Sequence, residues 1–130
     1  MKITGLDKVL RNLEFNDTKL RGAIRECGEI VEQSAIANIV EPILKPMVNK
    51  YDVIDRDFIG VNIGTDSEIG AYEEFGTGGF VVIPPETTPQ YVMQWYVNGK
   101  GTLHPNPWLF PAWRNNKSRV FEIIKKATVL

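Results

Sequence analysis

The sequence has 130 residues, of which 43% are hydrophobic and 24% are charged, and its formal net charge is −1. This length suits one domain with a single core, and the near-neutral charge argues against a protein that grips nucleic acid through many phosphate contacts. No apolar run reaches membrane-spanning length, so we expect no membrane partner. The single cysteine excludes an internal disulfide.

The N-terminal third predicts two helices. Apolar residues recur at helical spacing over residues 6–15. Asn16 and Asp17 are expected to break this helix and to cap the next one. The second helix is expected over residues 18–40, and Pro42 stops it. Its apolar stripe consists of Leu20, Ala23, Ile24, Cys27, Val31 and Ala35.

The middle of the chain predicts a β-hairpin. Residues 51–55 and 58–63 are rich in β-branched and aromatic side chains, which is typical of strands. A turn is expected over residues 55–57. The apolar residues do not alternate cleanly around Gly60, which predicts a bulge there.

The most informative run is Gly-Ala-Tyr-Glu-Glu-Phe-Gly-Thr-Gly-Gly, residues 70–79. Tyr72 and Phe75 share one face of a short helix, so we expect both rings in the core and Glu73 and Glu74 in solvent. Gly76 is placed to close the helix in the left-handed conformation. The following glycines predict a plain turn, because the run lacks the lysine and the spacing of a phosphate-binding loop.

Residues 80–103 form a long connection, which we call the excursion. Residues 80–83 predict a short strand that two prolines stop. Residues 91–97 fit either a strand or a short helix. Long excursions of this kind in a small domain are usually functional or partly disordered.

A final helix is expected to begin near Pro107 and to run close to the C-terminus. The predicted fold class is therefore α+β, with a small antiparallel sheet packed against the long N-terminal helix and the C-terminal helix. We expect one domain over residues 1–130.

The sequence offers little catalytic chemistry. A nucleophilic pair of Cys27 and His104 is formally possible, but Cys27 lies on the apolar stripe and is expected in the core. His104 stands among prolines and is expected in a loop. With one histidine and one cysteine, we expect no metal site and no cofactor.

Aromatic residues concentrate in the last third of the chain. Some must lie in the core, and the others are expected on a proline-rich surface, where aromatic side chains tend to mark protein–protein contacts. The predicted interface residues are Phe80, Val82, Trp95, Tyr96 and Trp108.

Two motifs occur far apart in the chain. The first is an aromatic-x-Glu-Phe-Gly-Thr run, formed by Tyr72, Glu74, Phe75, Gly76 and Thr77, and the second is a later proline-rich run before the closing helix, which contains Pro107, Leu109, Pro111 and Ala112. These two motifs resemble those of the tailed-phage family called HK-ninety-seven gene-product-ten-like. The order of the predicted elements also agrees along nearly the whole chain.

This resemblance implies a virion-assembly protein without catalysis, at the phage or prophage head–tail junction or tail end. It implies a ring-like homo-oligomer that contacts neck, connector or tail-tube proteins. The protein would reside in the virion, and in the host cytoplasm during assembly. Two alternatives are a small hydrolase built on Cys27 and His104 and a nucleic-acid-binding module. The second would use the basic residues of the C-terminal helix, Lys117, Arg119, Lys125 and Lys126.

Overall fold

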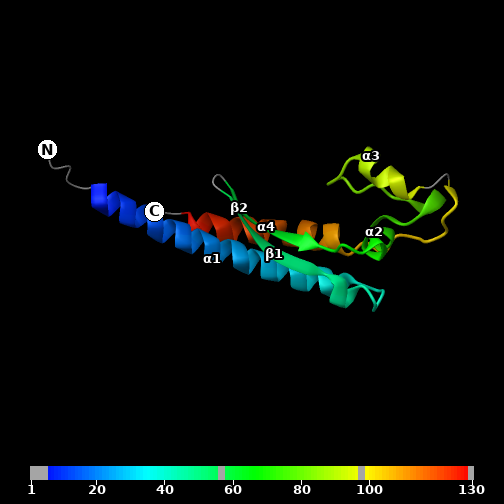
Figure 1. Ribbon diagram of the computed structural model, residues 1–130, viewed down its shortest axis with the longest axis horizontal. Coiled ribbons are helices and arrows are strands. Elements are labelled where there is room, and N and C mark those ends of the chain that lie inside the picture. The colour runs from blue at the N-terminus through cyan, green and yellow to red at the C-terminus, as the bar shows by residue number, and fades with distance from the viewer. Residues whose placement is uncertain (1–5, 56–57, 97–98, 129–130) are drawn as a thin grey trace.

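The computed structural model describes residues 6–55, 58–96 and 99–128. Within them, a long helix is followed by a β-hairpin, two short helices and a second long helix (Figure 1). The predicted α+β class is confirmed. The helices and strands are α1 (Leu6–Asn38), β1 (Asn49–Asp55), β2 (Phe58–Gly64), α2 (Glu68–Phe75), α3 (Pro89–Val92) and α4 (Leu109–Ala127).

Helix α1 is one continuous helix, so the predicted break at Asn16 and Asp17 is wrong. Asp17 does not cap a new helix. Its carboxylate instead pairs with Arg21 one turn later, at 3.1 Å. The helix propensities of Asn and Asp lie well under ~1 kcal/mol below that of Ala, and tertiary packing of the rest of the helix overrides them. The helix ends at Asn38, four residues before Pro42.

Helices α1 and α4 lie antiparallel and side by side (Figure 1). Small side chains let them approach, since Ala35 and Ala112 have no exposed surface. Trp108, 2% exposed, closes one end of this core next to the connection that follows α1. The buried core cluster is Cys27, Val31, Ala35, Ile39, Leu44, Trp108, Ala112 and Val120.

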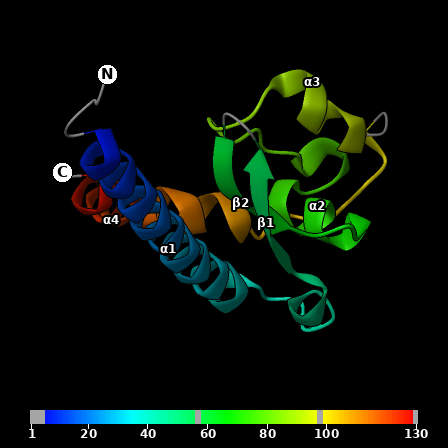
Figure 2. The ribbon, with the colours of Figure 1, turned by 60° about the vertical axis from the view of Figure 1, so that its left-hand side comes forward.

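Strands β1 and β2 pair antiparallel with one partner per residue, from Asn49 opposite Gly64 to Asp55 opposite Phe58. The hairpin is confirmed, but the bulge predicted at Gly60 is wrong because Gly60 pairs regularly with Val53. Residues 56–57 of the predicted turn lie outside the described residues. In Figure 2 the hairpin stands between the α1–α4 pair and the segment that carries α2 and α3.

The excursion is less regular than predicted. Residues 80–83 form no strand, because a 3₁₀ turn over Gly78–Phe80 leads into irregular backbone and only Val82 N–H bonds to Phe75 O, at 2.9 Å. The segment that fitted either a strand or a helix is helical, as α3 and a 3₁₀ turn over Met93–Trp95. Val97, its last predicted residue, lies outside the described part of the chain.

Helix α4 begins at Leu109, two residues after Pro107 and close to the expected start, and Trp108 occupies its N-cap position. Pro107 therefore precedes the helix. Pro111 lies in the first turn, where a missing N–H costs no intrahelical hydrogen bond. None of the described helices is both long enough and apolar enough to cross a lipid bilayer.

Two glycines of α1 differ in their surroundings and give a matched pair of variants. A Cβ atom at Gly28 would lie 2.8 Å from Cγ1 of Val61, whereas a Cβ at Gly22 would meet nothing within 4 Å. Gly22→Ala should raise the free energy of unfolding by about 0.5–1 kcal/mol through helix propensity. The free energy of unfolding of Gly28→Ala should be about 1–3 kcal/mol lower than that of Gly22→Ala, because the β-branched side chain of Val61 must move to make room for the new methyl group.

Urea denaturation of both variants measures this difference. Equal stabilisation by the two substitutions would show that α1 does not pack closely on β2 at Gly28.

Candidate functional site

The two sequence motifs meet at the start of α4. Glu74, on α2, accepts hydrogen bonds from three backbone N–H groups: Trp108 at 2.5 Å and Leu109 at 3.2 Å on Oε2, and Phe110 at 2.6 Å on Oε1. The carboxylate is 4% exposed. A negative charge here also faces the positive end of the α4 dipole. Glu74 therefore caps a helix that begins 35 residues later in the chain.

Burial sets the direction of the Glu74 pKa. Removal of the carboxylate from water raises the pKa of Glu74 above its ordinary value. The N–H groups of Phe110, Trp108 and Leu109 and the charge of Arg114 act in the opposite direction and only partly offset this effect.

Neighbouring residues strengthen the same junction. Trp108 Nε1 donates to Gly70 O at 2.9 Å, and Asn106 N donates to Glu73 O at 2.6 Å. The side chain of Asn106 also donates to Glu73 Oε2 at 3.2 Å. The prediction that Glu73 and Glu74 lie in solvent is wrong, since they are 9% and 4% exposed. Their use as acceptors for the second motif is the reason.

The glycine-rich turn after α2 forms hydrogen bonds with the last residue of the excursion. Thr77 N donates to Leu103 O at 2.9 Å, and Leu103 N donates to Thr77 Oγ1 at 3.0 Å. Gly76 and Gly78 have φ of 79° and 59°. A Cβ at Gly78 would lie 2.1 Å from Gly101 O. Glycine is therefore required at Gly78 both for its backbone conformation and for the close approach of the two segments.

Two further contacts hold the excursion against the rest of the fold. Arg114 makes a bidentate pair with Glu86, with Nε and Nη2 donating at 2.7 and 2.9 Å. Phe75, 4% exposed, packs against Trp95 and Tyr91 with ring centroids 5.4 and 6.1 Å apart. The excursion is thus anchored at three places: at its neck, where Thr77 hydrogen-bonds to Leu103, at Glu86, and through its aromatic side chains.

The predicted interface residues divide into three groups. Phe80, Val82 and Tyr96 are 40%, 56% and 40% exposed on the excursion. Trp95 is half-buried against Phe75. Trp108 is buried in the core, so its prediction as an interface side chain is wrong. Its indole N–H is already bonded inside the fold, which a sequence cannot reveal.

The excursion carries much of the exposed apolar surface of the described residues. Besides the three exposed predicted residues, four further large apolar side chains are exposed there, and sequence reasoning did not single them out. Their shared signal is apolar character within a proline-rich connection. These additional residues are Ile83, Tyr91, Met93 and Leu103.

A hollow of about 350 Å³ lies between α2, helix α3 of the excursion and the start of α4. Phe75, Tyr91, Trp95 and Phe110 contribute aromatic walls, and the carboxylates that line the hollow are Asp66, Glu68 and Glu74. Glu74 is already committed to α4, and Glu68 accepts from Tyr72 Oη at 2.9 Å.

The candidate catalytic residues occupy different environments. Cys27 is buried between α1 and α4, where its thiol donates to Val120 O at 3.8 Å. Burial raises the pKa of this thiol, which disfavours the thiolate. His104 is exposed and packs against the ring of Phe80, with centroids 3.9 Å apart. Within the described part of the chain, no group of three or more His, Cys, Asp or Glu side chains could hold a metal ion.

Comparisons of the chain with protein families, with curated proteins and with solved structures gave no match.

The Glu74 junction predicts a large difference between two adjacent glutamates. Glu74→Gln should lower the free energy of unfolding by roughly 2–3 kcal/mol, because an amide offers one acceptor oxygen and turns an NH₂ group toward a backbone donor. Glu73→Gln is the matched control and should cost less than about 1 kcal/mol, since its amide oxygen still accepts from Asn106. Equal losses in urea denaturation would contradict the special role of Glu74.

The raised Glu74 pKa predicts a pH dependence with a defined sign. The folded protein holds this proton more tightly than the unfolded chain does. The part of the Glu74 contribution that depends on protonation is therefore fully present below the unfolded pKa of about 4.3, and this part is lost as pH rises through the folded pKa. The stability advantage of the wild type over Glu74→Gln should shrink over this range, as measured by urea denaturation at successive pH values. An advantage that grows with pH would mean that the three N–H groups lower the pKa of Glu74 by more than burial raises it.

Gly78 and Gly79 provide a test of the neck of the excursion. Gly78→Ala should strain the backbone and displace Gly101. The free energy of local opening of residues 77–103 should therefore fall by about 1–3 kcal/mol. Gly79→Ala should have little effect, because a Cβ there meets nothing within 4 Å. Amide hydrogen exchange of residues 77–103 measures the local opening. Unchanged protection in Gly78→Ala would show that this contact does not hold the excursion.

Proposed function

We propose that the protein is a structural component of a tailed phage or prophage, at the head–tail junction or the tail end. It acts by self-assembly and by contacts with neck, connector or tail-tube proteins, and it performs no catalysis. The assembly is a ring-like homo-oligomer that resides in the virion and forms in the host cytoplasm. The resemblance of the two sequence motifs to the phage family is the basis of this proposal.

One observation carries the proposal furthest. The two resembling motifs, far apart in the sequence, form a single joint in which Glu74 of the first caps the helix that begins in the second. Their joint occurrence therefore has a common structural cause. It supports reading the resemblance as one of fold and not as two chance matches.

The exposed apolar surface of the excursion supports assembly as the mode of action. Exposed apolar side chains gathered on one segment are typical of a surface that meets another protein. The anchored neck and the Arg114–Glu86 pair hold this segment in place on a small scaffold. The excursion is thus a suitable contact for a neighbouring copy in a head-to-tail ring.

Two valine substitutions test this contact. Val82→Asp, on the excursion, should abolish ring-sized oligomers, because a carboxylate must be desolvated in an apolar contact. Val40→Asp, just beyond α1, is the matched control, since Val40 is exposed to 68% and Val82 to 56%. It should leave assembly intact. Light scattering and negative-stain imaging of the wild type and both variants measure the oligomers.

The proposal fails if the wild-type protein is a strict monomer at high concentration and has no affinity for tail-tube or connector proteins. Equal effects of the two valine substitutions would place the contact outside the excursion.

Four exposed basic residues on α4 favour the nucleic-acid alternative: Lys117, Arg119, Lys125 and Lys126. A salt titration of DNA binding separates the two functions. Phosphate contacts would weaken binding steeply as salt rises, whereas the structural proposal expects no appreciable binding at physiological salt.

A further inference from the structure

Strand β1 is an edge strand whose outer side has no partner within the described residues. Its backbone pairs with β2, and no other described backbone group bonds to Asn49–Asp55. Helix α1 covers β2 more than β1, since Gly28 packs directly on Val61. Lys50, Tyr51 and Asp52 are exposed. The unpaired N–H and C=O groups of such an edge are a template for another strand.

Several of the usual protections of an edge are missing from β1. The strand contains no proline and no bulge, and its seven residues exceed the common strand length of about five or six. Its lysine does not shield the edge, because Lys50 Nζ pairs with Glu29 and lies 3.5 Å from Glu32 on α1.

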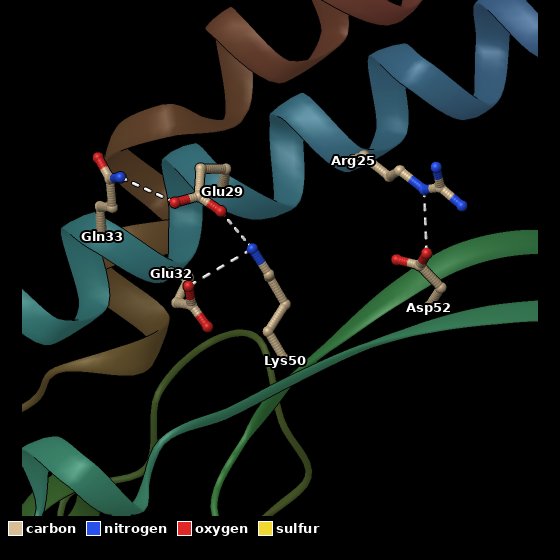
Figure 3. A network of polar contacts seen from close by, with 6 residues as sticks. All are labelled: Arg25, Glu29, Glu32, Gln33, Lys50 and Asp52. Carbon is tan, nitrogen blue, oxygen red and sulfur yellow. Dashed lines mark hydrogen bonds and ion pairs between the residues drawn. The ribbon is translucent and has the colours of Figure 1, made fainter.

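Lys50 and Asp52 of β1 lie on the face toward α1 (Figure 3). Lys50 reaches Glu29, and Asp52 Oδ2 accepts from Arg25 Nε at 3.0 Å. Tyr51, between them, points to the opposite face because side chains alternate along a strand. There it is 60% exposed, and its hydroxyl accepts from Asn62 at 3.3 Å.

We propose that β1 pairs antiparallel with β1 of a second copy of this chain, centred on Tyr51. In this register Tyr51 lies opposite its own counterpart, and Lys50 of each copy lies opposite Asp52 of the other. The two opposite-charge pairs extend the contacts to α1 into an alternating row: Glu29, Lys50, Asp52 of the second copy and Arg25 of the second copy. Cross-strand pairs of opposite charge stabilise antiparallel sheets.

The charge order selects this register and this occupant. With both α1 helices on one face of the joint sheet, the neighbouring symmetric registers are centred on Lys50 or on Asp52. Each of those places like charges directly opposite one another, which destabilises the pairing. With both α1 helices on one face, Lys50 and Asp52 are therefore complementary to their counterparts in one register only.

The joint sheet has room for both long helices. Each α1 lies mainly over β2, and the two β2 strands are three strand spacings apart in a four-stranded sheet, or roughly 14 Å. A helix with its side chains is about 10 Å across, so the two α1 helices fit without a clash.

This inference goes beyond the proposed function and does not depend on it. The β1 contact is isologous and closes a two-fold dimer, whereas a head-to-tail ring uses a heterologous contact. A head-to-tail contact has no two-fold axis that would set Tyr51 opposite its own counterpart, and a two-fold dimer through β1 does not use the excursion.

Cysteine cross-linking of the full chain tests the register. Tyr51→Cys should form a disulfide-linked dimer under mild oxidation, because directly opposite residues of antiparallel strands have Cα atoms about 4.5–5.5 Å apart. Asn62→Cys is the matched control. It replaces the exposed residue that pairs with Tyr51 inside the hairpin, and it should not cross-link. The wild type, with its buried Cys27, should also remain unlinked.

A charge exchange tests the same contact without a cross-link. Lys50→Glu and Asp52→Lys should each weaken the dimer about five- to thirtyfold in sedimentation equilibrium, because the two-fold axis repeats every changed pair. The double variant Lys50→Glu, Asp52→Lys should regain part of the affinity, since opposite charges again face each other across the two strands, although each then lies beside a like charge of α1. Urea denaturation checks that each variant is folded.

The proposal is overturned if Tyr51→Cys links no faster than Asn62→Cys. It is also overturned if the folded double variant dimerises no better than the single variants, or if the wild type sediments as a 14.7 kDa monomer.

Discussion

The carboxylate of Glu74 satisfies the exposed donors at the start of α4. The first four N–H groups of a helix have no partner within the helix. Here three of these positions, Trp108, Leu109 and Phe110, donate to Glu74. The fourth is Pro111, which has no N–H. The Glu74 carboxylate and the missing N–H of Pro111 therefore leave no unpaired backbone donor at the start of α4, next to the buried side chain of Trp108. The rest of the structure depends on this joint, because α4 packs against α1 and contributes Ala112 and Val120 to the core.

The joint also explains how a small chain can carry a long excursion. Residues immediately after Glu74 form the turn that binds Leu103, and residues immediately before Trp108 bond to Glu73. Both ends of the excursion are therefore tied to α2. The apolar residues between these ends can stay exposed without loosening the core, which is the property that an assembly surface requires. The hairpin edge is separate from this region, so a β1 contact and an excursion contact can form independently.

Part of this architecture follows from local sequence rules. The long helices, the hairpin and the fold class follow from apolar periodicity and from β-branched runs. The errors have one physical origin, which is long-range contact. Asp17 stays within α1 because tertiary packing outweighs its low helix propensity. Residues 80–83 form no strand because no other described strand pairs with them. Glu74 is charged and therefore predicted in solvent, yet donors 34 residues later stabilise it in the interior.

Amide hydrogen exchange at the start of α4 tests the central claim most directly. If Glu74 holds the N–H groups of Leu109 and Phe110, these amides should exchange only upon global unfolding, with protection equal to that of the middle of α4. First-turn amides that are bonded only to water exchange much faster. Rapid exchange of both amides, in a protein whose α4 interior is protected, would contradict the account.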